Sequence, residues 1–172
     1  MHKLPIMLAV LSVTGCSTVQ TAESVAVSKV ASADLLRADG SAAGVATLSQ
    51  RSDGLWLSVA ADAPGRGTYG MHVHAVGKCE GPEFTSSGPH WNPAMKQHGR
   101  DNPMGAHSGD LPNVTTNADG KLAIETKLNG AMFSQVLDAD GASIIIHEKA
   151  DDYKTDPSGN SGKRLICGVF KS

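Results

Sequence analysis

The sequence predicts an all-β domain built as an antiparallel sandwich or barrel. Several segments alternate apolar and polar residues with a period of two, and no helical period of convincing length appears. The alternating segments are separated by Asp-Gly dipeptides, which are typical of tight turns between strands. These dipeptides lie at residues 39–40, 53–54, 119–120 and 140–141.

Length and composition are consistent with one such domain. The chain has 172 residues, of which 40% are hydrophobic, so it can bury a substantial core. Its formal net charge is −2 with neutral histidines, which provides no basic surface for nucleic acid.

The first 16 residues are expected to be removed from the mature protein. A positive start at Lys3 is followed by a mostly apolar stretch, residues 4–13, that is too short to span a bilayer. Thr14-Gly15-Cys16 then resembles the bacterial lipobox, in which the cysteine becomes the lipidated first residue. We expect a lipoprotein-type signal peptide over residues 1–16 with a lipid on Cys16; the alternative is an ordinary cleavable leader with a chance cysteine. Without the leader the net charge is −3.

Residues 17–32 are mostly small and polar, and no period of 2 or 3.6 is sustained there. This composition predicts a flexible tether that holds a domain off a membrane. The folded domain is expected to cover residues 33–172.

The first strands are predicted from alternation. Leu35 to Arg37 runs into the first Asp-Gly turn, and residues 45–49 and 55–60 alternate in polarity. Ala63-Pro64-Gly65 breaks the pattern, and residues 69–74 then form a further strand. On that strand His72 and His74 share a face, which suits two imidazole ligands on one transition metal.

Residues 75–119 show little strand pattern. Five of the eight prolines and six glycines lie there, and so long an irregular stretch is unusual in a compact domain. It needs cross-links other than a core, such as a metal or a disulfide. The candidate residues for such cross-links are Cys79, His90, His98, His107 and Asp110. Strand pattern returns at residues 121–127, 142–147 and 165–170.

Every histidine outside the leader falls in one series of motifs. In chain order these are Gly-Met-His72-Val-His74, Ser-Gly-Pro-His90-Trp-Asn-Pro, Gln-His98-Gly, His107-Ser-Gly-Asp110-Leu, Ile-His147-Glu-Lys-Ala-Asp151-Asp152 and Gly-Lys-Arg164-Leu-Ile-Cys167-Gly-Val. Together they resemble the copper/zinc superoxide dismutases, most closely the exported bacterial branch, over about residues 33–172.

The resemblance implies a fold and a set of residue roles. The fold is a Greek-key, eight-stranded, flattened β-barrel with two long loops that form the metal site, an immunoglobulin-like sandwich architecture. Copper would be held by His72, His74, His90 and His147, and zinc by His90, His98, His107 and Asp110. Asp151 would link His72 to His98, Cys79 and Cys167 would form a disulfide, and Arg164 would attract the anionic substrate beside copper.

The implied activity is dismutation of superoxide to dioxygen and hydrogen peroxide by alternating reduction and oxidation of copper. One copper and one zinc ion per subunit are the implied cofactors, and His90 would carry a proton when copper is reduced. The implied location is the bacterial periplasm or cell envelope, where the enzyme protects against superoxide. The only membrane contact would be the lipid on Cys16, and monomer and homodimer both remain open.

The chemistry of the residues agrees with these roles. Four imidazoles suit Cu(II), and three imidazoles with one carboxylate suit tetrahedral Zn(II). Setting Cys16 aside leaves one cysteine pair, which suits an oxidising compartment.

Other interpretations of these residues stay open at this point. Cys167 is alternatively a buried free thiol, Arg164 a surface charge and Asp151 the cap of a turn. A non-enzymatic protein of the same fold would lack a copper ligand, the shared His90 or Arg164. A cupin-type oxygenase would need a Glu and a further His at different spacing. Lys149, Lys154 and Lys163 are candidates to extend the positive charge around Arg164, or are ordinary solvated lysines.

Overall fold

The computed structural model describes residues 26–172, and the expected signal peptide and Cys16 lie outside them. The strands are β1 (Val27–Arg37), β2 (Ala42–Arg51), β3 (Gly54–Asp62), β4 (Thr68–Tyr69), β5 (Met71–His74), β6 (Val114–Thr115), β7 (Lys121–Leu128), β8 (Ser143–His147) and β9 (Arg164–Val169). The helical elements are a 3₁₀ turn, η1 (Thr85–Ser87), and one α-helical turn, α1 (Phe133–Val136). The all-β prediction is confirmed.

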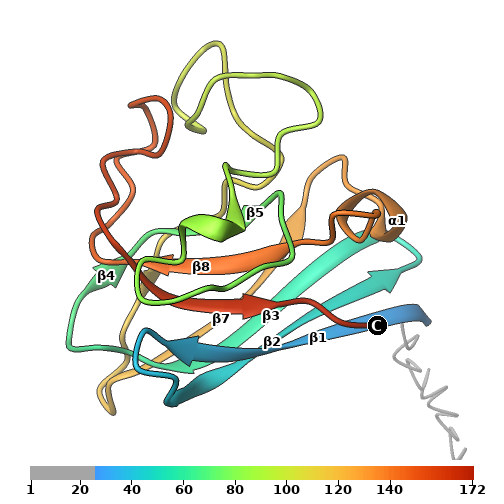
Figure 1. The fold of residues 1–172 in the computed structure, drawn as a ribbon. Helices are drawn as coiled ribbons and strands as arrows, with labels where there is room; N and C mark the ends of the chain where they lie inside the picture. Colours follow the sequence, from blue (N-terminus) through green and yellow to red (C-terminus); the bar gives the residue numbers. More distant parts are fainter. Residues whose placement is uncertain (1–25) are drawn as a thin grey trace, which may run out of the picture.

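The strands form one curled antiparallel sheet and one short pair (Figure 1). The seven-stranded sheet has the order β5-β8-β9-β1-β2-β3-β7, and β4 pairs with β6. Neighbours that are distant in sequence, such as β9 with β1 and β3 with β7, reflect the Greek-key connections.

The expected fourth strand is divided at Gly70 into β4 and β5. Gly70 donates to the carbonyl of Lys149 at 2.8 Å and accepts from the His147 amide at 2.9 Å. A Cβ on Gly70 would lie 3.2 Å from the Asp151 nitrogen. The chain therefore leaves its pairing with β6 and joins β8 at a point where the backbones lie so close that a larger residue would force Asp151 or Ser161 to shift.

The first hairpins follow the predicted alternation. On β3, Leu55, Leu57 and Val59 are buried while Ser58 and Ala60 face outward. Buried residues of β1 and β2 pack on the same side, with Leu35 and Leu48 fully enclosed. The period of two thus places one face of each strand in the core.

The tether predicted for residues 17–32 is wrong at its C-terminal end, because β1 already begins at Val27. Residues 27–30 are exposed on both faces, although Lys29 and Val30 pair with Gln50 and Ser49 of β2. Backbone pairing with β2 holds this part of the strand, together with a hydrogen bond from Ser28 Oγ to the Gln50 carbonyl. Because these side chains are all exposed, residues 27–30 show no alternation of apolar and polar residues in the sequence. The alternation begins only at Ala31, Ala33 and Leu35, which point into the core.

Strand β8 is buried on both faces. Ile144 and Ile146 belong to the main core, whereas Ile145 packs against Phe84 and Cys167 under the loop that follows β5. This explains why residues 144–146 form a continuous apolar run rather than an alternating one. The end of β8, where His147 lies, is correspondingly well fixed.

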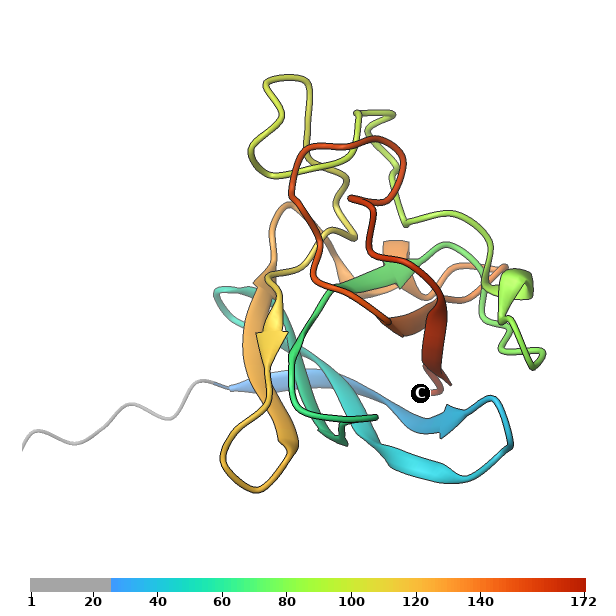
Figure 2. The same cartoon turned by 90° about the vertical axis from the view of Figure 1, so that its left-hand side faces the viewer.

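The later part of the first long loop, residues 89–113, and the second long loop, residues 148–163, lie together at one end of the molecule (Figures 1 and 2). Residues 81–83 of the first loop instead lie beside Ala38, in the turn after β1. Helix α1 was not predicted, because a single turn is too short to show a period; Phe133 and Val136 fix it to the core.

In residues 26–172, no helix has the length and apolar character needed to cross a membrane.

A disulfide joins Cys79 of the first long loop to Cys167 of β9, with the two Cα atoms 5.8 Å apart. The implied pairing is confirmed. Phe84 and Ile145 pack around it. The bond ties an irregular segment to a core strand across 88 residues of sequence, and so restricts the unfolded chain strongly.

We expect removal of this disulfide to destabilise the fold. Replacing both cysteines (Cys79→Ser with Cys167→Ser) should lower the free energy of unfolding by about 2–5 kcal/mol, measured by urea denaturation of the metal-free protein. Cys16→Ser is the matched control and should leave the midpoint unchanged. Equal midpoints for the double variant and the wild type would contradict a stabilising role.

Candidate metal centre

β5 is the last strand of the sheet, and its outer edge forms hydrogen bonds with the first long loop. The Val73 amide donates to the Gly109 carbonyl at 2.9 Å, and the Trp91 amide donates to the Val73 carbonyl at 2.8 Å. These bonds set His90 opposite His74 and Asp110 opposite His72. A Cβ on Gly109 would lie 2.3 Å from the Val73 carbonyl oxygen, so this approach requires glycine.

The first cluster contains four buried histidines. His72 and His74 project from β5, His147 ends the neighbouring strand β8, and His90 comes from the loop. One ring nitrogen from each lies within 4.8 Å of the others. The sequence-predicted copper residues are therefore brought together.

Three of these rings are oriented by an acceptor on the far side. His74 Nδ1–H donates to the Gly88 carbonyl at 2.9 Å, His147 Nδ1–H to the Gly162 carbonyl at 3.3 Å, and His72 Nε2–H to Asp151 at 2.8 Å. The opposite nitrogens are then acceptors without protons. The backbone and one acid thus fix which lone pairs point inward.

Those inward lone pairs have no partner in the protein. Among the described side chains, the buried nitrogen and oxygen atoms that lack a hydrogen bond are His72 Nδ1, His74 Nε2, His90 Nε2 and His147 Nε2. Buried polar atoms are normally satisfied, and four imidazole nitrogens aimed at one place suit copper. The residues present therefore fit this metal.

The second cluster is centred on Asp110. Its Oδ1 lies 2.9 Å from His90 Nδ1, 3.0 Å from His98 Nδ1 and 3.3 Å from His107 Nδ1. Three imidazole nitrogens and one carboxylate oxygen are a zinc donor set. The possible ligands within 4.8 Å of one another here are His72, His90, His98 and Asp110. His107, the predicted zinc residue, is not in that group, although its Nδ1 lies 3.3 Å from Asp110 Oδ1.

His90 belongs to both clusters. Its Nε2 is one of the four unpartnered atoms, while its Nδ1 contacts Asp110 and lies 3.3 Å from His107 Nδ1. The same ring thus presents one nitrogen to each candidate metal, as the resemblance implied. Only a group deprotonated at both nitrogens serves two cations in this way.

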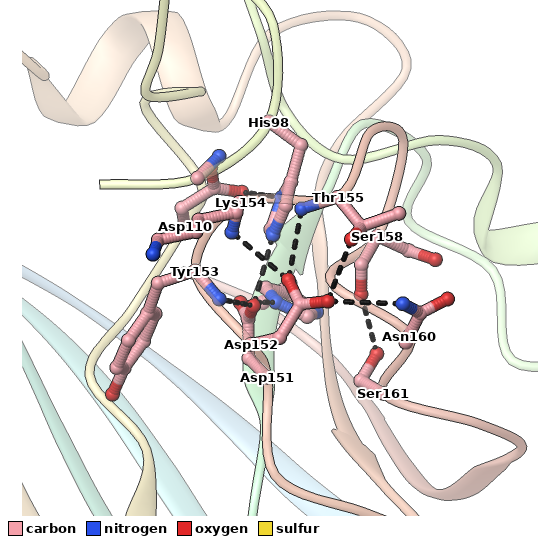
Figure 3. Close-up of polar contacts among 12 residues, drawn as sticks. His98, Asp110, Asp151, Asp152, Tyr153, Lys154, Thr155, Ser158, Asn160 and Ser161 are labelled. Atoms are coloured by element: carbon pink, nitrogen blue, oxygen red, sulfur yellow. Dashed lines mark hydrogen bonds and ion pairs between the residues drawn. The ribbon is translucent and has the colours of Figure 1, made fainter. Parts of the chain in front are cut away.

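Asp151 contacts a histidine of each cluster, and Figure 3 shows it beside His98 and Tyr153. Its carboxylate accepts from His72 Nε2 at 2.8 Å and from His98 Nε2 at 3.0 Å. It also accepts from the Tyr153 amide at 2.6 Å, and its backbone is held by Asn113. Asn113 and Tyr153 were missed by sequence reasoning, since neither carries a motif of its own.

The loop that carries Asp151 is organised by its neighbour. Asp152 accepts from the Lys154 and Thr155 amides at 2.9 and 2.8 Å and from the Asn160 side chain at 2.9 Å (Figure 3). These bonds lower the pKa of Asp152 to about 2, with the Thr155 hydroxyl bond contributing most. The shape of this segment is therefore defined by side-chain hydrogen bonds in place of regular structure.

Burial keeps the first cluster uncharged. It lowers the pKa of His74 to about 2, of His147 to about 3 and of His90 to about 4, and it also lowers the pKa of His72. Desolvation disfavours a protonated imidazole. At neutral pH these rings are the neutral ligands that a metal requires.

The second cluster behaves oppositely because it contains acids. Burial opposes charge on His98, but hydrogen bonds to Asp110 and Asp151 outweigh it and raise the pKa of His98 to about 9. Burial likewise opposes charge on the two acids, and their histidine partners lower the pKa of both well below the usual range. This cluster is charge-compensated and holds a proton that a cation would replace.

A cavity of about 950 Å³ opens over the first cluster. His90, His147, Arg164 and Lys96 are among its lining residues. Arg164 reaches it from the start of β9, where a register shift brings Arg164 opposite His147. Lys96 was not predicted, whereas Lys149, Lys154 and Lys163, the predicted lysines, are not among the residues that line this cavity.

The sequence was compared with known families. The family model for "copper/zinc superoxide dismutase" matches residues 42–170. A superoxide dismutase-like protein of Bacillus subtilis is 42% identical over 144 residues, 79% of this chain and 73% of that protein. A protein of Aquifex aeolicus named superoxide dismutase [Cu-Zn] 1 is 37% identical over 145 residues, 81% of this chain and 86% of its own.

Solved structures give the same picture. A SOD-like protein from Bacillus subtilis superimposes with a TM-score of 0.77 at 40% identity, covering 80% of this chain and 96% of that one. The Cu/Zn superoxide dismutase from Brucella abortus gives a TM-score of 0.69 at 25% identity, covering 83% of this chain and all of that one.

The double role of Asp151 predicts a specific loss. Asp151→Asn keeps one acceptor oxygen but puts an NH₂ where the second carboxylate oxygen was, so His72 or His98 loses its partner. We expect affinity for the metals to fall roughly 10- to 100-fold, measured by competition with a chelator. The exposed acid Asp140 offers the control: Asp140→Asn should bind both metals as the wild type does. Wild-type affinities in Asp151→Asn would contradict the assigned role.

Proposed function

This chain belongs to the copper/zinc superoxide dismutase family, and from that membership we propose the role of each residue in its metal centre. The protein is an enzyme that converts superoxide to dioxygen and hydrogen peroxide, with copper and zinc as cofactors. The observation that carries the proposal is the convergence of four unpartnered imidazole nitrogens beside a ring shared with a zinc-type cluster.

We assign the ligands by atom. Copper would be held by His72 through Nδ1 and by His74, His90 and His147 through Nε2. Zinc would be held by the Nδ1 atoms of His90, His98 and His107 and by Asp110 Oδ1. When bound, copper supplies a one-electron redox couple and zinc supplies fixed positive charge beside His90.

The remaining steps depend on the chain's own residues. Arg164 would bind the anion in the cavity that it lines, because its charge persists at every physiological pH. His90 lines the same cavity and would hold a proton destined for the product. Asp151 would hold the rings of His72 and His98 in fixed positions, so that the copper and zinc sites stay at a fixed separation.

Local charge must overcome the field of the whole protein. Superoxide is a monovalent anion, and the chain without its leader carries −3. Arg164 and Lys96 line the cavity together with Asp138 and Asp156, so the formal charges of the wall cancel, and the proposed positive focus is the position of Arg164 opposite His147. Such focusing raises the encounter rate of a charged substrate.

The proposed function is tested by metal content together with superoxide decay. The purified protein should contain one copper and one zinc ion and accelerate decay. His90→Ala should lower zinc content and shift the copper absorption and EPR spectra together, because one ring contacts both sites. The bridge assignment fails if zinc content and the copper spectrum both stay unchanged. Absence of activity in a fully loaded wild type would overturn the function itself.

Arg164 variants test capture of the anion. Arg164→Ala should lower the rate several-fold with copper retained, Arg164→Glu should lower it further, and Arg164→Lys should fall between wild type and Ala because it keeps charge but not the planar fork. The wild-type rate should also decrease as salt rises, since charges are screened within about 8 Å at physiological ionic strength. Equal rates for wild type and Arg164→Glu at low salt would show that the anion does not pass this residue.

We also propose that the protein is exported and anchored at Cys16 in the cell envelope. The Cys79–Cys167 disulfide supports an oxidising compartment, and the lipobox-like Thr14-Gly15-Cys16 supports the anchor. The only membrane contact would be through this lipid. Cys16→Ser should move the protein from the membrane to the soluble fraction with activity intact. A wild type that is already soluble, with a different mature N-terminus, would remove the anchor.

A further inference from the structure

The guanidinium of Arg164 is held by a short segment, residues 84–88, that lies between the disulfide and His90. Its Nη1 donates to the Phe84 carbonyl at 2.9 Å and to Ser87 Oγ at 2.6 Å. The contact between Ser87 and Arg164 was not predicted from the sequence. Two acceptors on one nitrogen fix the plane of the guanidinium as well as its position.

The Ser87 hydroxyl has a defined orientation. The residue is fully buried, and its Oγ–H donates to the Phe84 carbonyl at 2.8 Å. A hydroxyl has one proton and two lone pairs, so the lone pairs are left to accept from Arg164. Arg164 Nη1, Ser87 Oγ and Phe84 O therefore form a closed triangle in which every donor is used.

The backbone of Ser87 is fixed as firmly as its side chain. Its amide donates to the Phe84 carbonyl at 3.2 Å, and its carbonyl accepts from the Val76 amide at 3.1 Å. The next carbonyl, of Gly88, accepts from His74 Nδ1. One five-residue segment thus orients both Arg164 and a candidate copper ligand.

We propose that Ser87 is a positioning residue, which sets the Arg164 guanidinium for a small monovalent anion above the copper site. The inference rests on the function proposed above, in which Arg164 attracts superoxide. Ser87 does not touch the anion. It acts by removing rotational freedom from the guanidinium, so that the N–H groups not used by residues 84–88 face the cavity that His90 and His147 line.

Truncation of Ser87 isolates this effect. Ser87→Ala removes a donor and an acceptor together, and Phe84 O keeps the Ser87 amide and Arg164 as donors, so no buried polar group loses its last partner. The adjacent serine provides a matched control. Ser86 Oγ accepts from the Glu80 amide at 2.8 Å in the same loop and makes no hydrogen bond to Arg164.

Azide is the probe, because it is a small monoanion whose binding changes the visible absorbance of Cu(II). Protein loaded with copper and zinc is titrated at low salt as wild type, Ser87→Ala, Ser86→Ala, Arg164→Ala and Ser87→Ala with Arg164→Ala. We expect Ser87→Ala to bind azide roughly three- to tenfold more weakly, and Ser86→Ala to match the wild type. In the Arg164→Ala background, Ser87→Ala should add no further loss.

Two outcomes overturn the positioning role: unchanged azide affinity in Ser87→Ala, or an equal loss with and without Arg164. Failure of the proposed function is distinguishable, because Arg164→Ala would then bind azide as tightly as the wild type. If Ser87→Ala does not retain both metals, the wild type supplies a second measurement. In the reduced, diamagnetic protein, the Arg164 Nη1 protons should give resolved, slowly exchanging NMR signals. Signals averaged by rotation would overturn the proposal.

Discussion

Asp151 fixes the spacing of the two histidine clusters, because its two carboxylate oxygens accept hydrogen bonds from histidines in different parts of the chain. His72 lies on β5, whereas His98 lies on the long loop that follows it. The acid itself belongs to the second long loop, whose turn is held by Asp152. Three segments that are remote in sequence are thus joined through one buried group, and a shift of any of them would move both clusters.

Burying four imidazole rings with unpartnered nitrogens costs free energy. The low pKa values of His74, His90 and His147 arise from desolvation, and the inward lone pairs find no donor in the protein. The rigid support comes from elsewhere: β5 and β8 are buried along their whole length, and the disulfide fixes the loop to β9. The packing of the sheet therefore offsets the cost of desolvating the histidines, and it keeps their side chains from moving apart or admitting water.

Much of the centre could be predicted from the sequence because ligands must be particular residue types at particular spacings. His-x-His on a strand, and His107 three residues before Asp110, are such patterns. Residues that act through geometry rather than chemistry were missed. Lys96 lines the cavity only because its loop folds back, and the Asn113 and Tyr153 contacts depend on which loops meet. The start of β1 was also missed, since strand pairing with exposed side chains leaves no hydrophobic period.

Segment 84–88 shows why the loop after β5 is ordered although it lacks regular structure. Phe84 is buried against Ile145 and Cys167, which anchors the segment on the sheet. From that anchor the Phe84 carbonyl and the Ser87 hydroxyl reach Arg164, while the Gly88 carbonyl reaches His74. Phe84 and Gly88 adopt positive φ values of 53° and 73°, which turn these acceptors toward two different partners. The Arg164 guanidinium and the His74 ring are therefore both held by acceptors of the same five-residue segment, which fixes the separation between them.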